Sequence, residues 1–334
     1  MTDSRTAFVT GATGVVGPVL VRRLLADGWT VRALVRRADA PLPAGTVAVV
    51  GDLDDAAALA RGVEGAEAVV HLAALLHIVD PPPDLDALYT RVNVDGTRRL
   101  VAAAAAAGVA RVVFASTINV YGPSRGGAPW TEASATCPDS AYAQTKLDAE
   151  ALVRALPVGV VLRLAAVVGP GMKGNYPALQ RMLGAGLRVL PGNGANRRTL
   201  VHVSDAAAAF ALAAAGGVPP GTYNLTDGRV HSFDALVRSL QAAAGRVPGV
   251  YYVPAAPVRA VLGLPAAAAR VVGRRFSGPA LVDKLVEDIA VSGERLAVAS
   301  AFRPSVDVLA HGWASPGEAQ PEGPIPEATA PDVR

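Results

Sequence analysis

Tyr142 and Lys146 are the two side chains whose types and spacing best suit proton transfer. They lie four residues apart in segment 140–152, whose pattern predicts a helix, so we expect both on one face of that helix. A phenol has a pKa near 10 and is a poor acid or base at neutral pH. Lowering that pKa to about 7 requires roughly 4 kcal/mol, which a nearby ammonium in a poorly hydrated cleft can largely supply. The pair therefore predicts a tyrosine acid–base assisted by lysine, although two exposed helix residues would show the same spacing.

A glycine-rich segment near the start of the chain predicts a dinucleotide-binding turn. The apolar run 7–10 predicts a buried strand, glycines follow at three-residue spacing, and 18–26 has the apolar pattern of a helix. This order places a pyrophosphate at a helix N-terminus, where backbone N–H groups point at it. An ordinary strand-to-helix loop is the alternative, because three such glycines alone are weak evidence. The predicted cofactor contacts are Gly11, Thr13, Gly14, Val15, Val16 and Gly17.

The end of the second predicted strand, 30–35, bears on the type of cofactor. An acidic residue there binds the ribose 2′-hydroxyl of NAD, whereas an arginine accommodates the 2′-phosphate of NADP. Arg36 and Arg37 follow this strand and no carboxylate does. Two guanidinium groups can hold the extra phosphate, so the sequence favours NADP, with NAD as the alternative. Two solvated surface arginines would have the same sequence.

The elements that must position these residues alternate along the first half of the chain. Strands are expected at 7–10, 30–35, 46–50, 68–71, 111–115 and 158–164, and helices at 18–26, 54–61, within 84–107 and at 140–152. Such alternation implies right-handed crossovers and a parallel sheet. We therefore predict an α/β fold with a Rossmann-type, doubly wound parallel sheet.

Composition limits the function classes. The chain has 334 residues, of which 51% are hydrophobic and 18% charged, with a net charge of +3 and no clustered basic face. Nucleic acid is therefore not expected as a partner. The single cysteine, Cys137, excludes an internal disulfide and fits a reducing compartment. No signal peptide precedes the first strand and apolar runs break before about 20 residues, so we expect a cytoplasmic protein without a transmembrane helix.

Further segments carry a resemblance to a known family. They are 10–17, 51–53, 71–74, 93–97, 116–122 and 142–146. Together they resemble an extended short-chain dehydrogenase/reductase of the NAD-dependent epimerase/dehydratase family, over nearly all of residues 6–313. The resemblance implies a dinucleotide-binding domain over 1–165, a smaller C-terminal substrate-binding lobe mainly over 166–313 with strands returning to the first domain near 199–215, and a homodimer. A tail over 314–334, rich in Pro, Glu, Ala and Gly, is expected to be disordered.

The resemblance also assigns roles to single residues. Thr117, Tyr142 and Lys146 are the implied catalytic residues: Thr117 orients the reacting oxygen, and Lys146 also holds the nicotinamide ribose. Asn93 is expected to brace the sheet and His71 to be a core residue at a strand end. Further implied cofactor contacts are Asp52 and Leu53 beside the adenine, and Leu72, Ala73 and Ala74 along the dinucleotide.

The residues after Thr117 narrow the reaction. Dehydratases of this family carry Asp-Glu there, whereas this chain has Ile118 and Asn119, neither of which can transfer the protons that water elimination needs. We therefore expect carbonyl/alcohol redox chemistry, with or without inversion of configuration, and no metal ion.

Three segments of the second half resemble those of a bacterial subgroup that reduces 4-keto N-acetylated sugars carried on nucleotide or polyprenyl diphosphate. They are 169–175, 196–203 and 281–289. Arg198 matches the family's diphosphate-binding arginine, and Lys173 and Asn175 are further candidates for the substrate. Ala166 and Val168 stand where the family usually has an asparagine and an aromatic residue, which argues against a simple UDP-galactose-type epimerase.

Other features of this half have structural interpretations. His202 and Asp205 are expected to stabilise a loop and the start of helix 206–215, with Ser204 as its N-cap. Residues 223–225 predict a short strand closing the substrate lobe. The alanine-rich segment 255–272 predicts two lobe helices or, alternatively, a peripheral membrane contact.

The predicted function is an NADP- or NAD-dependent oxidoreductase acting at a sugar carbon, carbon 4, of a diphosphate-linked sugar. One alternative is a nucleotide-sugar 4-epimerase with tightly held NAD. Another is a hydroxysteroid- or flavonoid-type ketone reductase, for which Arg198 and Lys173 would have no charge to bind. A non-catalytic nucleotide-sensing subunit is the alternative from another class, and it would not need Thr117, Tyr142 and Lys146 together.

Overall fold

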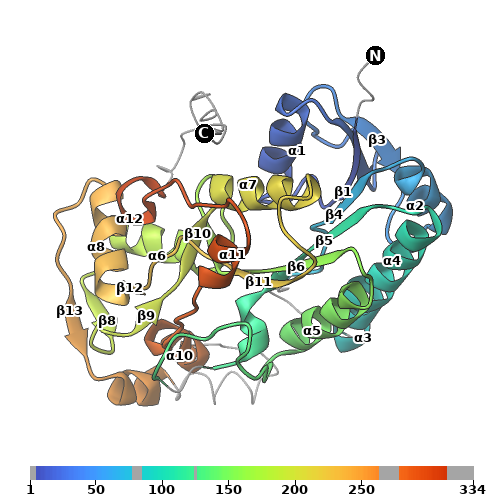
Figure 1. The fold of residues 1–334 in the computed structure, drawn as a ribbon. Helices are drawn as coiled ribbons and strands as arrows, with labels where there is room; N and C mark the ends of the chain where they lie inside the picture. Colours follow the sequence, from blue (N-terminus) through green and yellow to red (C-terminus); the bar gives the residue numbers. More distant parts are fainter. Residues whose placement is uncertain (1–4, 77–84, 124–125, 263–277, 314–334) are drawn as a thin grey trace.

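A seven-stranded parallel sheet forms the centre of the protein (Figure 1). The computed structural model describes residues 5–76, 85–123, 126–262 and 278–313. The strand order is β11-β6-β5-β4-β1-β2-β3. The strands are β1 (Thr6–Thr10), β2 (Thr30–Val35), β3 (Val47–Val50), β4 (Ala68–His71), β5 (Arg111–Thr117), β6 (Gly159–Leu164) and β11 (Gly221–Leu225). The predicted Rossmann-type α/β fold is confirmed.

Helices cover both faces of this sheet, because successive strand residues point to opposite sides. On one face, residues such as Val9 and Val113 pack with α1 (Gly17–Ala26) and α7 (Val203–Ala214). On the other, residues such as Phe8 and Phe114 pack with α2 (Ala56–Val63), α4 (Gly96–Ala106) and α5 (Ala141–Arg154). Figure 1 shows the two helix layers on either side of the strands. Residues 85–106 are helical as expected, as α3 (Leu85–Tyr89), a π-helical turn (Thr90–Asp95) and α4.

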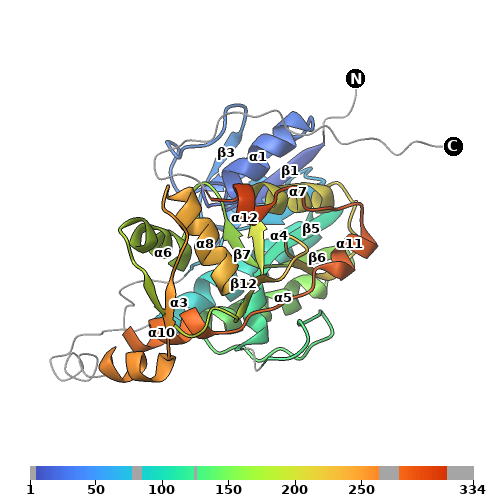
Figure 2. The same cartoon turned by 90° about the vertical axis from the view of Figure 1, so that its left-hand side faces the viewer.

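A third hydrophobic cluster lies in the lobe at the left of Figure 1, seen from its own side in Figure 2. Its centre is Leu183, Leu190, Phe233 and Leu240. The elements of the second half are β7 (Ala166–Val168), α6 (Asn175–Gly184), β8 (Val189–Pro191), β9 (Arg197–Arg198), β10 (Leu200–His202), β12 (His231–Ser232), α8 (Phe233–Ala243), β13 (Tyr251–Val253), α10 (Gly278–Val286), α11 (Glu294–Ala299) and α12 (Val308–His311). The domain boundary at 165/166 stays a prediction.

Two expectations for the second half are wrong. Residues 223–225 do not close the lobe: they belong to β11, which pairs in parallel with β6 at the edge of the main sheet. The reason is that α7 packs on the sheet face, so the strand after it enters the sheet next to β6. The N-cap of α7 is His202, not Ser204, because the His202 Nδ1 atom accepts a hydrogen bond from the Ser204 N–H.

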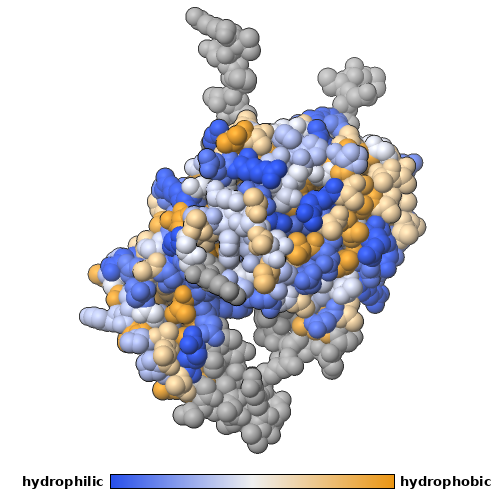
Figure 3. Space-filling model, turned by 60° about the horizontal axis from the view of Figure 1, so that its bottom comes forward, coloured by the Kyte–Doolittle hydropathy of each residue, from blue (hydrophilic) through white to orange (hydrophobic). Residues whose placement is uncertain are grey.

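A peripheral membrane contact is one of two predictions for segment 255–272. Within the described ranges, no helix combines the length and the apolar character needed to cross a bilayer. On the face shown in Figure 3, apolar residues lie in groups among hydrophilic ones. Segment 255–272 lies partly, and segment 314–334 wholly, outside the described residues. Peripheral membrane contact and the disordered tail therefore remain predictions.

Gly62 tests how tightly α2 packs on the sheet. A Cβ atom at Gly62 would lie 2.2 Å from the Phe8 ring, whereas one at Gly184 would lie 3.5 Å from the Ala244 Cβ atom. Overpacking a core costs about 1–3 kcal/mol. We expect Gly62→Ala to lower the free energy of unfolding by about that amount in urea titrations, whereas Gly184→Ala, at the end of α6 with room for a methyl group, should not lower it. Equal stability of the two variants would contradict this packing.

Candidate functional site

In the glycine turn between β1 and α1, backbone segments approach one another too closely to leave room for side chains. Gly11 has a φ of +75°, and a Cβ atom there would lie 2.6 Å from the Ala73 nitrogen. A Cβ atom on Gly17 would lie 2.4 Å from the Gly11 carbonyl oxygen. The first turn of α1 has no acidic residue, and its N-cap, Val16, supplies no side-chain hydrogen bond. Its free N–H groups therefore suit a pyrophosphate, as dinucleotide binding requires.

The other predicted cofactor residues follow β4 and β3 at the same end of the parallel sheet. Leu72, Ala73 and Ala74 follow β4, and the Ala73 N–H donates to Thr10 Oγ1 at 3.3 Å. Asp52 follows β3, and its Oδ1 atom accepts from the Asp54 N–H at 2.8 Å. Because the sheet order is β4-β1-β2-β3, these residues lie on both sides of the glycine turn that follows β1. Their contact with a dinucleotide stays a prediction.

Arg36 lies directly after β2 and is exposed. Among the described residues it forms no ion pair, whereas Arg37 pairs with Asp39 at 3.3 Å. The Arg36 guanidinium is thus available to an anionic group at this edge. Its role toward a 2′-phosphate stays a prediction.

His71 is a neutral core residue, as expected. Its side chain joins Thr10 Oγ1 at 2.7 Å through Nδ1 and Thr97 Oγ1 at 2.9 Å through Nε2. Since the Thr97 hydroxyl donates to the Asn93 carbonyl at 2.6 Å, it must accept from His71, which places the ring proton on Nε2. Burial, with a smaller contribution from the charge of Lys146, lowers the His71 pKa to about 3. The histidine therefore supports the strand ends and carries no proton at neutral pH.

Asn93 connects the segment after β4 to α5. Its Oδ1 atom accepts from the Leu75 N–H at 2.8 Å, and its Nδ2 atom donates to Thr145 Oγ1 at 3.2 Å. The prediction that Asn93 braces the sheet is therefore wrong, because its side-chain hydrogen bonds join a loop to α5 rather than strands to one another. Thr145 directly precedes Lys146, so Asn93 helps to fix the helix that carries the candidate catalytic pair.

The three candidate catalytic residues come from β5 and α5, which pack together. Thr117 ends β5, and its Oγ1 atom accepts from the Asn119 N–H at 3.2 Å, which leaves its proton free to donate. Tyr142 lies in the first turn of α5, half-buried, with its ring 6.2 Å from that of Tyr89. Lys146 is 2% exposed, and its Nζ atom lies 4.0 Å from the centre of the Phe114 ring.

Burial dominates the electrostatics of this pair. It lowers the Lys146 pKa to about 7, while the charge of Glu150 acts in the opposite direction. It also raises the pKa of Tyr142 above its usual range. The phenol is therefore protonated in this structure, and the ammonium lies over Phe114. Stabilisation of a Tyr142 phenolate by Lys146 stays a prediction.

The candidate substrate residues have different surroundings. Arg198 is 5% exposed, and its Nη2 atom donates to the Lys284 carbonyl at 2.6 Å and the Leu285 carbonyl at 3.1 Å. It thereby fixes β9 to the end of α10. Lys173 and Asn175 are exposed, the latter as the first residue of α6. The binding of a diphosphate by these three residues is untested.

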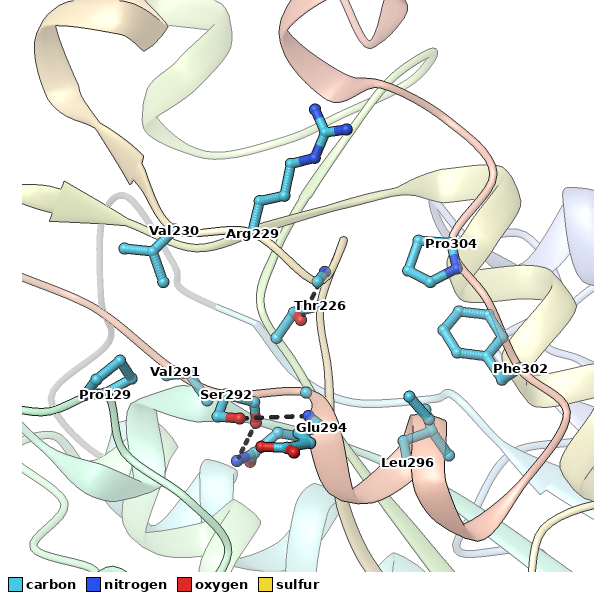
Figure 4. Close-up of a pocket in the computed structure, with 14 residues that line it drawn as sticks. Pro129, Thr226, Arg229, Val230, Val291, Ser292, Glu294, Leu296, Phe302 and Pro304 are labelled. Atoms are coloured by element: carbon cyan, nitrogen blue, oxygen red, sulfur yellow. Dashed lines mark hydrogen bonds between the residues drawn. The ribbon is translucent and has the colours of Figure 1, made fainter.

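Two hollows in the surface lie apart from the candidate catalytic residues. The first, about 350 Å³, is lined by residues such as Thr226, Leu296 and Phe302, which Figure 4 shows around it. The second, about 480 Å³, lies near the start of β6 and β11. Thr117, Tyr142 and Lys146 line neither. The described residues also contain no group of His, Cys, Asp or Glu that could hold a metal ion.

A buried hydrogen-bond network between α5, β5 and β6 was not predicted from the sequence. Glu150 of α5, 0% exposed, accepts from Arg163 of β6 and from Ser116 of β5. Two signals were present: Glu150 follows Lys146 by four residues, and Arg163 interrupts the apolar strand Gly159–Leu164. A charged residue in a buried strand requires a partner.

Comparison with known proteins gives one family. Residues 7–226 match the model of the NAD dependent epimerase/dehydratase family. A 3-diazoavenalumate denitrifying reductase of Streptomyces sp is 37% identical over 66% of this chain and 75% of the relative. A UDP-glucose 4-epimerase of Vibrio cholerae is 32% identical over 60% of this chain and 64% of the relative. The solved structure of MoeE5 in complex with UDP-glucose and NAD is 28% identical, with a TM-score of 0.70 over 93% of this chain and 96% of that one.

The neutral His71 predicts a pH dependence of stability. Its folded pKa of about 3 lies below the ordinary value of 6.5, so between these values the unfolded chain binds a proton that the folded protein does not. The free energy of unfolding should therefore fall as the pH falls below 6.5. From pH 7 to pH 5 we expect the wild type to lose about 2 kcal/mol more than His71→Gln in urea titrations. Parallel pH curves for the two proteins would contradict a buried neutral histidine.

Proposed function

Because this chain belongs to the NAD-dependent epimerase/dehydratase family, we propose that it is an NAD(P)-dependent oxidoreductase acting at carbon 4 of a sugar carried on a nucleotide or lipid diphosphate. The family consists of NAD-dependent epimerases, dehydratases and reductases, and relatives that act on nucleotide sugars are among its matches. The observation that supports the proposal is that Thr117 ends β5, while Tyr142 and Lys146 lie in the first half of α5, which packs on that strand.

Each of these residues has a part in moving a proton at the substrate oxygen. The bound nicotinamide would supply or accept the hydride. Thr117, whose oxygen accepts the Asn119 N–H, has its own hydroxyl proton left to donate to a carbonyl oxygen. Tyr142 is a phenol with a raised pKa, so it is in the acid form that a reduction needs. Lys146 would lower the phenol pKa and bind the nicotinamide ribose once its ammonium turns from the Phe114 ring.

The residues that follow Thr117 support redox chemistry over dehydration. Ile118 is buried, and Asn119 offers only an amide. Neither can exchange a proton with a sugar carbon or a leaving hydroxyl. A reductase and an epimerase both fit the remaining residues. A reductase releases its cofactor at each turnover, whereas an epimerase keeps NAD and returns the hydride to the other face.

One observation favours a second candidate, a reductase of an uncharged ketone. Arg198, the predicted diphosphate ligand, is buried and already donates to backbone carbonyls at the end of α10. The similarity to a 3-diazoavenalumate denitrifying reductase also fits a substrate that is not carried on a diphosphate, although the substrate in that name is a carboxylate and not an uncharged ketone. A non-catalytic nucleotide-sensing subunit is less consistent with the chain, because it would not need Thr117, Tyr142 and Lys146 together.

Tyr142→Phe tests the redox chemistry. Purified protein is mixed with NADPH or NADH and a panel of UDP-4-keto sugars and uncharged ketones, and reduced cofactor is followed by absorbance. Removal of the general acid should lower kcat by about 10²- to 10⁴-fold. Tyr251→Phe, at a tyrosine that is 74% exposed in the lobe, is the matched control and should leave kcat unchanged. Absence of turnover with every carbonyl, or full activity of Tyr142→Phe, would exclude the proposal, while cofactor that copurifies without exchanging would favour the epimerase.

Arg36→Ala tests the choice of cofactor. A charge-assisted hydrogen bond contributes about 1.5–3 kcal/mol, so the loss of this arginine should raise the KM for NADPH by about tenfold or more and leave that for NADH unchanged. Arg37→Ala, which removes a guanidinium paired with Asp39, is the control and should have a small effect. Equal changes with both cofactors would contradict a role in binding the 2′-phosphate.

A further inference from the structure

Glu150 connects three elements through one buried carboxylate. It lies on α5 with no exposed surface. Its Oε1 atom accepts from Ser116 Oγ at 2.5 Å and from Arg163 Nε at 2.9 Å, and its Oε2 atom accepts from Arg163 Nη2 at 2.7 Å. Ser116 belongs to β5 and Arg163 to β6. A bidentate pair of this kind fixes orientation as well as distance, so it sets how α5 sits on the two strands.

The ends of this network lie beside the candidate catalytic residues. Ser116 directly precedes Thr117 on β5. Glu150 follows Lys146 by one helical turn, on the same face of α5, and both side chains are buried. A rotation or shift of α5 relative to β5 would therefore have two effects at once: it would break the hydrogen bonds of Glu150, and it would move Lys146 relative to Thr117.

Glu150 also supplies the negative charge near Lys146. His71 of β4 is neutral, and burial raises the pKa of the Tyr142 phenol, whose ring lies 6.2 Å from that of Tyr89. Arg163 of β6 pairs with the Glu150 carboxylate, and the Tyr121 ring lies 4.9 Å from the Arg163 guanidinium. The charges on the helices that flank α5 pair with one another at the surface, as Arg91 and Arg99 do with Asp54. Among the described residues, Glu150 is the acid whose charge acts on Lys146.

We propose that Glu150 is a positioning residue for this reaction: it holds α5 in register with β5 and β6, and it places a negative charge one helical turn from the buried Lys146. Its catalytic consequence rests on the proposed function, since a protonated Lys146 is what Tyr142 needs to give up and regain its proton. The effect of Glu150 on Lys146 itself is a property of the folded chain and can be measured without substrate.

The direction of the effect follows from the charges. Burial lowers the Lys146 pKa to about 7, and the Glu150 carboxylate raises it against that effect. Replacing the carboxylate by a neutral amide removes the opposing charge. Lys146 then loses its proton at a lower pH, and less of it carries a charge at neutral pH.

The sequence makes this titration simple to observe. The chain has three lysines, Lys146, Lys173 and Lys284. In protein labelled with ¹³C at the lysine Cε atoms, NMR should show three resonances, which Lys173→Arg and Lys284→Arg assign. In cofactor-free Glu150→Gln we expect the Lys146 midpoint to fall by about one pH unit or more. An unchanged midpoint would overturn the proposal.

Three further variants separate charge from packing. Ser116→Ala removes one hydrogen bond and keeps the carboxylate, so the Lys146 midpoint should stay within experimental error of the wild type. Glu150→Asp keeps the charge and should retain a midpoint nearer the wild type than Glu150→Gln does. Glu150→Gln leaves Arg163 buried without its carboxylate partner. If this single variant does not fold, the double variant Glu150→Gln/Arg163→Gln removes both charges and allows the same titration of Lys146. A folded double variant with a lower midpoint supports the proposal, and one with the wild-type midpoint contradicts it.

Turnover provides the second measurement. With the carbonyl substrate found for the wild type, the alkaline limb of the kcat/KM profile should move to lower pH in Glu150→Gln, and activity lost at pH 7.5 should return in part at lower pH. A uniform loss at every pH would indicate a structural role alone and would overturn the proposal. Absence of turnover in the wild type would refute the proposed function, whereas the Lys146 titration would still decide the effect of Glu150.

Discussion

The buried pair of Arg163 and Glu150 is the interaction on which the geometry of the site depends. Removing two charges from water costs several kcal/mol for each ion, and the loss is offset only when geometry and additional hydrogen bonds are good. The Arg163 side chain is 4% exposed and that of Glu150 is 0% exposed, so neither has water as an alternative partner. The helix that carries Tyr142 and Lys146 therefore has one favourable position on β5 and β6, and deviation from it would leave a charge uncompensated.

Around this pair the site is assembled mostly from neutral groups. His71 is held without a proton by the hydroxyls of Thr10 and Thr97, and Asn93 joins the segment after β4 to α5 through uncharged hydrogen bonds. Glycines at the turn after β1 leave backbone N–H groups as the donors. Lys146 thus lies in surroundings of low polarity, where its electrostatic interactions at a given distance are stronger than at the surface.

The features of the fold and the site that depend on local sequence patterns could be predicted. The glycine turn, the alternation of strands and helices, and the spacing of Tyr142 and Lys146 are all visible within a few residues. The position of β11 could not be predicted in this way. A strand of three to five residues does not show in its sequence which strand, 50 residues or more away, it pairs with. The contacts of Arg198 with carbonyls near 284–287 and the pairing of Glu150 with Arg163 likewise depend on tertiary packing. The residue types at these positions give the charge of each side chain, but they do not show which groups it contacts in the folded protein.

The placement of β11 has a consequence for how the chain folds during synthesis. Until residue 225 has left the ribosome, β6 is an unpaired edge, and Tyr121 lacks Asn224, to which its hydroxyl donates at 2.7 Å. The first 165 residues thus contain six of the seven strands of the sheet, together with the glycine turn and all three candidate catalytic residues. Lobe segments must emerge before the sheet can close, so completion of the core is a late event governed by contacts distant in sequence.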